Sequence, residues 1–225
     1  MALRIGFDMD GVLADFAASY RAIEARAYGP AEPTPVDNPE DLTEDGKDAG
    51  GSPASSRRRK DAIWTLIRQT PDFWQTLRPL DPDAVRRIHE MTLRHRWETF
   101  FITQRPATDG ATVQRQTQHW LVKQGFDLPS VLVIEGSRGA AAGAMKLDYL
   151  VDDSPNNCVD VKSESKARPI LIVEDDDLIG IASARRIGIG TANGIGAALD
   201  ILERVSDART KPGVLKQLAQ LVGWK

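Results

Sequence analysis

The amino-acid sequence predicts an α/β protein: a doubly wound parallel sheet with a small helical cap inserted after the first strand. Short apolar runs alternate with helical patterns along most of the chain, whereas the stretch between the first run and residue 97 shows no strand pattern. Near-continuous apolar runs are typical of parallel strands covered by helices on both faces. We therefore expect a sheet domain formed by residues 1–15 and 97–225, and a cap formed by residues 16–96.

The predicted strands are short apolar runs at Leu3–Phe7, Thr99–Ile102, Val131–Ile134, Tyr149–Val151 and Ile170–Val173. The helices between them have recognisable ends. One starts at Asp81-Pro82, because proline favours the first helical turn, and a second runs from Thr108 to Gln124 before Gly125. Two more carry apolar stripes, one from Ile195 to Val205 and one after Pro212. Alternation of this kind predicts parallel strands joined by helical crossovers.

The cap is predicted from the segment that breaks the alternation. Residues 30–56 are rich in Pro, Gly, Ser and acidic residues, a composition typical of a linker or mobile loop. The basic run Arg57-Arg58-Arg59-Lys60 follows and is interpreted as a solvated helix face. An amphipathic helical pattern around Ile63 and Ile67 comes next. We expect these parts to form a small helical insertion over the sheet.

Composition excludes several classes of protein. The chain has 225 residues and a formal net charge of -3, so it has no general attraction for nucleic-acid polymers or anionic membranes. Its single cysteine, Cys158, excludes an internal disulfide framework and a Cys-rich zinc site. No apolar run approaches the roughly 18 residues of a membrane span, and no apolar signal region follows Met1. We expect a cytoplasmic protein with a small-molecule partner; the oligomeric state is not predicted.

Two aspartates follow the first predicted strand, in the segment Ile5-Gly6-Phe7-Asp8-Met9-Asp10-Gly11-Val12. Because residues i and i+2 of an extended segment point to the same side, both carboxylates can face one site. Ligands of open α/β sheets bind beyond the carboxyl ends of the strands, which is where this pair falls. The pair is a candidate active site, although a solvated turn would show the same pattern.

A second strand also ends in carboxylates, because Asp152 and Asp153 follow Tyr149–Val151. If the two strands are neighbours, four carboxylates converge. At an effective dielectric constant of about 20, two like charges about 5 Å apart repel each other by roughly 3 kcal/mol. Such a site requires a cation, and oxygen ligands of this kind are preferred by Mg²⁺. The sequence therefore predicts Mg²⁺ as the cofactor.

Two further segments offer groups for a phosphate. Thr103 ends the strand Phe100-Phe101-Ile102 and precedes Gln104-Arg105-Pro106, so its hydroxyl and the N–H groups of the next turn can hold phosphate oxygens. Lys146 lies just before the acidic strand and can place an ammonium against the same phosphate. Each residue alone also fits another interpretation, Thr103 as a helix cap and Lys146 as a surface lysine.

In this order along the chain, the motifs resemble those of the haloacid dehalogenase-like phosphohydrolase superfamily: Asp8-x-Asp10-Gly11-Val12, Thr103, Lys146 and Asp152-Asp153. A response-regulator receiver shares the topology but places its phospho-acceptor aspartate on a middle strand. The resemblance implies an aspartyl-phosphate mechanism. It makes Asp8 the nucleophile and Asp10 the acid and base for the leaving oxygen and the attacking water.

The same resemblance assigns the remaining groups. Mg²⁺ would be bound by Asp8, the backbone carbonyl of Asp10 and Asp153, and Asp152 would orient the waters of the metal ion or Lys146. The phosphate would be bound by Thr103 and the N–H of Gln104, with Lys146 stabilising the charge of the transition state.

Within this superfamily, the chain is most similar to the cytosolic type C 5'(3')-deoxyribonucleotidase family. The shared segments are Asp8 to Phe16, Thr103 before Arg-Pro, and Pro71 to Leu80. The resemblance implies that nucleoside monophosphates are the substrates and that aromatic residues stack on the base, worth roughly 1–3 kcal/mol. The candidates are Phe16, Trp64, Phe73 and Trp74, and each fits core packing of a small cap equally well. Gln104 departs from the small residue that the family more often shows.

Several functions stay open at this point. The leading hypothesis is a Mg²⁺-dependent phosphomonoesterase for nucleoside monophosphates. The alternatives are a phosphatase for another small metabolite such as a sugar phosphate, a phosphotransferase, and a catalytically silent protein that binds a phosphorylated ligand. The complete set of aspartates argues against the silent binder, because a pure binder has no need for Asp10.

Overall fold

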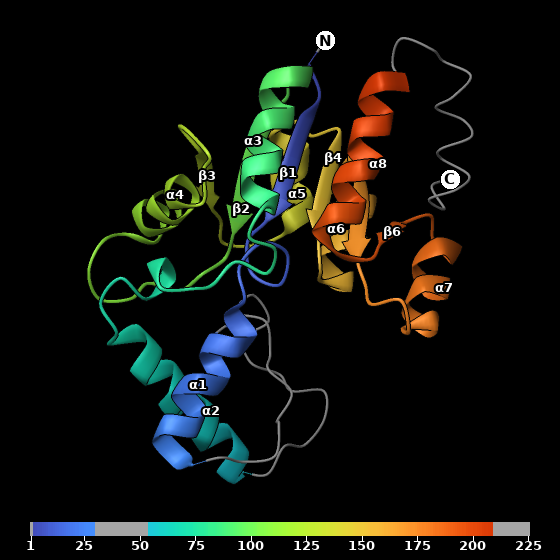
Figure 1. The fold of residues 1–225 in the computed structure, drawn as a ribbon. Coiled ribbons are helices and arrows are strands. Elements are labelled where there is room, and N and C mark those ends of the chain that lie inside the picture. Colours follow the sequence, from blue (N-terminus) through green and yellow to red (C-terminus); the bar gives the residue numbers. More distant parts are fainter. Residues whose placement is uncertain (1, 30–53, 209–225) are drawn as a thin grey trace.

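The computed structural model describes residues 2–29 and 54–208 and confirms the α/β prediction. Its six parallel strands have the order β3-β2-β1-β4-β5-β6 (Figure 1). Their bounds are β1 Arg4–Asp8, β2 Glu98–Thr103, β3 Ser130–Val133, β4 Tyr149–Asp152, β5 Arg168–Ile172 and β6 Gly190–Ala192. The predicted strands are all present. β6 was not predicted, because its sequence Gly-Thr-Ala is too short and too small to form an apolar run.

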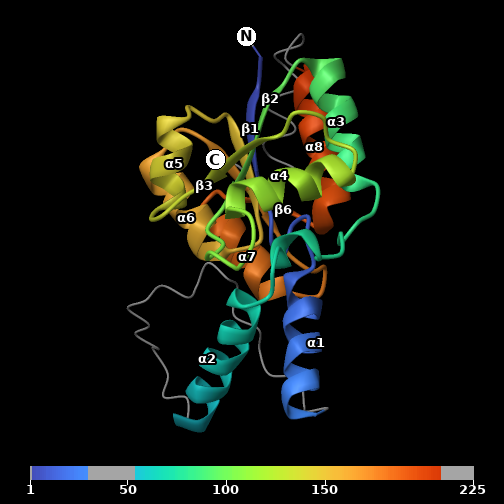
Figure 2. The same cartoon turned by 90° about the vertical axis from the view of Figure 1, so that its left-hand side faces the viewer.

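Helices cover both faces of the sheet, as expected for a doubly wound fold (Figures 1 and 2). One face is covered by α3 Ala84–His95, α4 Val113–Lys123 and α8 Gly194–Ala208, whose buried side chains join the larger hydrophobic core. The other face packs against α5 Arg138–Ala144 and α6 Pro155–Glu164, next to α7 Leu178–Arg186. The predicted helix after Pro212 lies outside the described residues. No helix in the described part of the chain is long and apolar enough to cross a bilayer.

Alternation along β1 shows why this strand is central. Ile5 and Phe7 are fully buried in the larger core, whereas Gly6 faces the opposite side. A Cβ atom at Gly6 would lie 2.8 Å from side-chain atoms of both Leu147 and Leu150, so this glycine lets the second core pack directly on the strand. The strand is therefore covered on both faces, and its two charged residues, Arg4 and Asp8, stand at its ends.

The cap is a pair of helices, α1 Phe16–Tyr28 and α2 Ala54–Arg68, that project away from the carboxyl edge of the sheet (Figures 1 and 2). The chain segments entering and leaving the cap are paired, because Asp15 N donates to the carbonyl of Arg78 and Leu80 N to that of Leu13. Most of the predicted linker, residues 30–53, lies outside the described residues. The basic run at 57–60 is part of α2, and the first two of its residues are exposed, as predicted for a solvated face.

Helix α3 packs with the sheet domain, although the sequence prediction included it in the cap. Arg87 on α3 pairs with Asp200 of α8 at 2.6 Å, and Trp97 Nε1 donates to Ser206 Oγ at 2.9 Å. An amphipathic helix next to an insertion gives no signal in the sequence that tells which domain its apolar side covers. We propose that the cap ends near Pro79, which forms a bridge with Ala14.

Candidate active site

The sheet register brings the predicted motifs to one edge. Asp8 lies opposite Ile102 at the end of β1, one residue before Thr103, and Phe7 lies opposite Val151, one residue before Asp152. Parallel strands all end at the same edge, so the side chains of Asp8, Thr103 and Asp152 meet there. All three are fully buried. The predicted convergence of strand ends is therefore present.

Asp10 follows in a tight turn beyond β1. The N–H groups of Leu13 and Ala14 both donate to the Met9 carbonyl, and Gly11 has φ 80°. A Cβ atom at Gly11 would lie 1.8 Å from Asp153 Oδ2, so only glycine lets the turn approach this carboxylate. The glycine of the motif thus brings the turn after β1 directly against Asp153.

The cation beside Asp8 is Arg138, a residue that the sequence analysis did not select. Its Nη2 donates to Asp8 Oδ1 at 2.9 Å, and its Nε lies 3.3 Å from Asp152 Oδ2. Arg138 is buried at the first position of α5, where Ser137 Oγ caps the helix by accepting hydrogen bonds from the N–H groups of Gly139 and Ala140. Gly139 lets α5 approach α6, because a Cβ there would lie 2.2 Å from the Asp160 carbonyl oxygen. This close packing places the guanidinium between two strand ends.

Lys146, the cation that the sequence predicted, lies elsewhere. It is exposed and ends α5 in a left-handed conformation with φ 50°. Asp148, two residues later, donates its N–H to the carbonyl of Arg4 at the start of β1. The whole length of β4 therefore separates Lys146 from Asp152. Proximity in sequence to the acidic strand was misleading, because the lysine precedes the strand and the site lies beyond its end.

Asp10 is paired with a second buried arginine. Arg105 Nε donates to Asp10 Oδ2 and its Nη2 to Oδ1, both at 2.7 Å. The remaining nitrogen, Nη1, donates to Thr117 Oγ1 at 3.0 Å. Two arginines thus offset much of the carboxylate charge at the site. The converging carboxylates therefore do not by themselves require a metal ion. This corrects the expectation from the sequence, which assumed that nothing in the chain neutralised them.

Asp152 and Asp153 differ in their surroundings. Asp152 Oδ1 accepts from Ser154 N at 2.9 Å and from Asn157 Nδ2 at 3.2 Å, and its Oδ2 faces Arg138. The cation that Asp152 contacts is therefore Arg138, and not Lys146, which the resemblance had placed beside it. Cys158 is buried in α6, and burial, followed by the charges of Asp152 and Asp153, raises the pKa of its thiol well above the ordinary value. This cysteine is not a nucleophile.

Thr103 and Gln104, the two residues predicted to bind phosphate at the end of the second strand, have different surroundings. Thr103 Oγ1 is buried and has no hydrogen-bond partner within residues 2–29 and 54–208, next to Asp8 in the sheet. A buried hydroxyl without a partner costs about 1–3 kcal/mol, so it points to a ligand at this position. Gln104 turns its Nε2 to the carbonyl of Gly136, at 2.6 Å, and so holds the loop that leads to Arg138.

The four aromatic residues predicted to stack on a base pack against one another. Phe16 is stacked on Trp64 with ring centroids 5.5 Å apart, and Phe73 meets Trp74 edge to face at 5.0 Å. All four side chains are buried. We call Phe16, Trp64, Phe73 and Trp74 the aromatic cluster. This cluster joins α1 and α2 to the sheet domain. In this structure its residues therefore pack as core, the second of the two interpretations that the sequence allowed.

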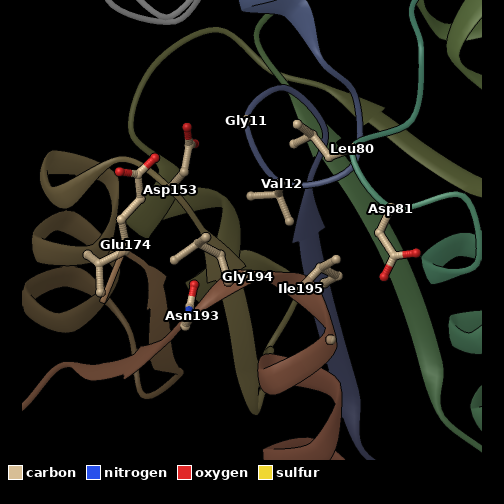
Figure 3. A pocket seen from close by; sticks show the side chains of 12 residues that line it. Gly11, Val12, Leu80, Asp81, Asp153, Glu174, Asn193, Gly194 and Ile195 are labelled. Atoms are coloured by element: carbon tan, nitrogen blue, oxygen red, sulfur yellow. The ribbon is translucent and has the colours of Figure 1, made fainter. Parts of the chain in front are cut away.

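A pocket of about 570 Å³ opens beside Asp153 (Figure 3). Figure 3 shows Asp153 and Glu174 on one side of it and Asp81 on the other, with the turn at Gly11 above. The start of α8 at Gly194 closes the pocket from below. Glu174 belongs to the acidic loop 174–177, which is exposed as predicted. The aromatic cluster does not line this pocket.

A comparison with protein families identifies the chain. The model for "5' nucleotidase, deoxy (Pyrimidine), cytosolic type C protein" matches residues 2–179, well over half of the sequence. The chain belongs to this family. It is an enzyme of the phosphatase class, as the resemblance implied. A comparison with curated proteins finds no significant match.

Solved structures similar to this nucleotidase-family chain share its fold. A haloacid dehalogenase-like hydrolase from Streptococcus pneumoniae has a TM-score of 0.56 at 12% identity, covering 89% of this chain and 98% of its own. A proposed beta-phosphoglucomutase from Thermotoga maritima has a TM-score of 0.54 at 18% identity, covering 90% and 99%. A hydrolase from Deinococcus radiodurans with bound phosphate and sodium has a TM-score of 0.53 at 12% identity, covering 95% and 97%. At these identities, the similarity establishes the haloacid dehalogenase-like fold.

The two arginines could have been found from weak signals in the sequence. A basic residue at the first position of a helix is unfavourable, because the helix N-terminus carries a partial positive charge. Arg138 stands there, directly after the N-capping Ser137, which indicates that carboxylates compensate it. Arg105 lies two residues after Thr103 in a motif already assigned to the site. Neither signal reveals which carboxylate each arginine contacts.

Proposed function

We propose that this nucleotidase-family enzyme is a Mg²⁺-dependent phosphomonoesterase that forms an aspartyl-phosphate on Asp8 and acts on (deoxy)nucleoside monophosphates. The observation that carries the proposal is the arrangement at the end of β1. The Asp8 carboxylate lies between a buried guanidinium, 2.9 Å away, and the strand end that holds the unpartnered Thr103 hydroxyl. A phosphate placed there meets a nucleophile, a positive charge and a hydrogen-bond donor at once.

In the proposed reaction, Asp8 attacks phosphorus, and the bond from phosphorus to the leaving oxygen breaks. Asp10 donates its proton to that oxygen and then takes a proton from the water that hydrolyses the aspartyl-phosphate. Thr103 Oγ1 donates to a phosphate oxygen. Arg138 takes the role that the resemblance implied for Lys146, stabilising charge on the phosphoryl oxygens.

The residues at the site fit a magnesium ion. The turn at Gly11 brings Asp153 against the segment after Asp8, and the donors offered there are oxygen atoms, which Mg²⁺ prefers. Asp8, the carbonyl of Asp10 and Asp153 would hold the ion, with Asp152 behind them. When bound, it supplies positive charge that lets an anionic nucleophile approach a phosphate.

The substrate is the finer part of the proposal. The family description names deoxy pyrimidine nucleotidases of the cytosol, which supports nucleoside monophosphates and a cytoplasmic location. One observation favours a second candidate, a phosphatase for a smaller metabolite such as a sugar phosphate. The aromatic cluster is buried, so a base can stack on it only if the cap helices move.

The test is phosphate release by the full chain from 5'- and 3'-ribo- and deoxyribonucleotides, several sugar phosphates and an aryl phosphate, with Mg²⁺ or with EDTA. The Asp8→Asn variant is the blank, and we expect its turnover to fall by at least about 10³-fold. Preference for nucleotides supports the proposal, and preference for sugar phosphates selects the second candidate. Full activity in EDTA contradicts the magnesium assignment, and full activity of Asp8→Asn contradicts the nucleophile assignment.

A further inference from the structure

Arg105 donates hydrogen bonds from all three of its side-chain nitrogens, yet the proposed chemistry does not use it. Both of its contacts with Asp10 are 2.7 Å long, one from Nε and one from Nη2, so the guanidinium and carboxylate meet as two parallel forks. Both side chains are at most 1% exposed. A buried fork of this kind fixes the plane of the carboxylate as well as offsetting its charge.

Other contacts hold the arginine itself in place. The third nitrogen donates to Thr117 Oγ1 on α4, and the Trp74 ring covers the guanidinium with its centroid 4.8 Å from Cζ. Trp74 is fixed in turn, because its Nε1 donates to the Pro106 carbonyl and its N–H to Gln116 Oε1. The arginine is therefore held by contacts with Asp10, Thr117 and Trp74.

A proton donor needs such orientation. An acid that protonates a leaving oxygen has to place its proton within hydrogen-bond distance of that oxygen, and a misplaced group loses much of a contribution of about 10²–10⁴-fold. The fork fixes the plane of the Asp10 carboxyl group, so the proton that Asp10 takes from the attacking water of the preceding turnover is carried on the side of an oxygen that faces away from the guanidinium. The guanidinium stabilises the carboxylate that forms when this proton leaves. A lysine at this position would retain the charge and lose the fork.

We propose that Arg105 is a positioning residue for the Asp10 acid, held in place by Trp74 and Thr117. The inference rests on the proposed function. In the step concerned, the bond from Asp8 to phosphorus forms, the bond from phosphorus to the leaving oxygen breaks, and the Asp10 proton passes to that oxygen. The products are an alcohol, the aspartyl-phosphate and an Asp10 carboxylate paired with Arg105.

The test compares two esters that differ in one atom, thymidine 5'-monophosphate and its analogue with sulfur as the bridging atom. The thiol is far more acidic than the alcohol, so the sulfur ester needs no proton to leave. We expect Arg105→Lys to lower kcat/KM for the oxygen ester by about 10²-fold and for the sulfur ester by less than about fivefold. A merely structural role would lower both values equally. Arg86→Lys, at an exposed pair with Asp83, is the matched control and leaves both unchanged.

Thr117→Val provides a second, milder variant. It removes the hydroxyl acceptor of Arg105 Nη1 with little change in shape. We expect it to lower kcat/KM by about fivefold for the oxygen ester and to leave kcat/KM for the sulfur ester unchanged. Unfolding in urea, measured for each variant, separates loss of folded protein from loss of catalysis. If Arg105→Lys does not fold, the test of the positioning role is the loss of kcat/KM that Thr117→Val causes for the oxygen ester, compared with its loss for the sulfur ester.

The outcomes separate the inference from the function on which it rests. Equal losses for the two esters, or no loss, overturn the positioning role and leave the phosphatase proposal standing. Hydrolysis of neither ester by the wild-type enzyme overturns the nucleotidase proposal and the inference with it. A wild-type enzyme that cleaves only the oxygen ester also contradicts the inference, because leaving-group protonation would then not limit the reaction.

Discussion

The carboxylates of Asp8 and Asp10 at the carboxyl edge of the sheet and the rings of the aromatic cluster are both buried, but different interactions stabilise their burial. At the sheet edge, buried carboxylates are bound by buried arginines, Asp8 by Arg138 and Asp10 by Arg105. In the aromatic cluster, rings from both cap helices and from the segment after them pack against one another. The first region is costly to bury without partners, whereas the second gains free energy from burial itself.

This difference explains why a sequence locates charged sites more reliably than aromatic binding surfaces. A buried charge has to have a partner or a ligand, so a cluster of charges at one edge remains a site in any packing of the protein. An aromatic residue has no such requirement, so it serves equally well as a binding surface or as core. The structure brings the charged residues together at one edge of the sheet and packs the aromatic residues against one another.

The largest expected effect separates the two candidate cations. Arg138→Gln should lower turnover by about 10³-fold, because it removes the positive charge beside the nucleophile. It should also lower the free energy of unfolding by about 3–5 kcal/mol, since Asp8 and Asp152 lose a buried partner. Lys146→Gln is the control and should change turnover by less than about twofold. Phosphate-release kinetics and urea unfolding measure both effects. A strong effect of Lys146→Gln would contradict the site geometry.

A smaller effect is expected from the turn beside Asp153. Gly11→Ala places a methyl group where Asp153 Oδ2 now lies, 1.8 Å from the ideal Cβ position, so the carboxylate has to move. Displacement of a reacting group by about 1 Å can cost about 10²-fold in rate, and we expect a loss of that size together with a raised Mg²⁺ requirement. Turnover titrated with Mg²⁺ measures both. Gly196→Ala is the control, because a Cβ there meets nothing within 4 Å. An unchanged Mg²⁺ titration would count against Asp153 as a ligand.

The aromatic cluster should respond in stability rather than in specificity. Trp64→Ala removes a buried ring that stacks on Phe16, and we expect the free energy of unfolding to fall by about 3–5 kcal/mol. KM for nucleotides and for an aryl phosphate should change by the same factor if the ring only packs. A selective increase of KM for nucleotides would show that the cluster opens and binds the base. Leu93→Ala, on an exposed side chain, is the control for stability.

The smallest effect concerns Cys158, behind the acidic strand ends. Because burial raises the pKa of its thiol, little thiolate forms near neutral pH, and iodoacetamide should react very slowly with the native protein. Full reaction is expected only in denaturant, as measured by mass spectrometry. The same shift makes unfolding easier at high pH. The unfolded thiol ionises above about pH 8.5, whereas the folded one stays protonated, so stability falls as the pH rises beyond that value. Rapid alkylation of the native protein would show that the packing around Cys158 opens.

Much of the fold could be predicted because its signals are local. Apolar runs marked the strands from Leu3–Phe7 to Ile170–Val173, and the end of each strand located Asp8, Thr103 and Asp152. Two local signals were too weak. Gly190–Ala192 is too short for a run, and the helix predicted to start at Thr108 begins at Val113. Residues before Val113 are held by tertiary contacts instead, because Ala111 N donates to Asp72 Oδ1.

By itself, the sequence located the polar groups at the edge of the sheet: an acidic pair at the end of the first strand, a hydroxyl at the end of the second, and a second acidic pair at the end of the fourth. Those positions follow from strand direction alone, since parallel strands end at one edge. Only the tertiary structure decided which cation reaches Asp8, what holds Asp10, and whether the aromatic residues face a ligand or one another. These choices depend on contacts between segments far apart in the chain, such as Arg138 with Asp8 and Arg105 with Asp10, and no local pattern encodes them.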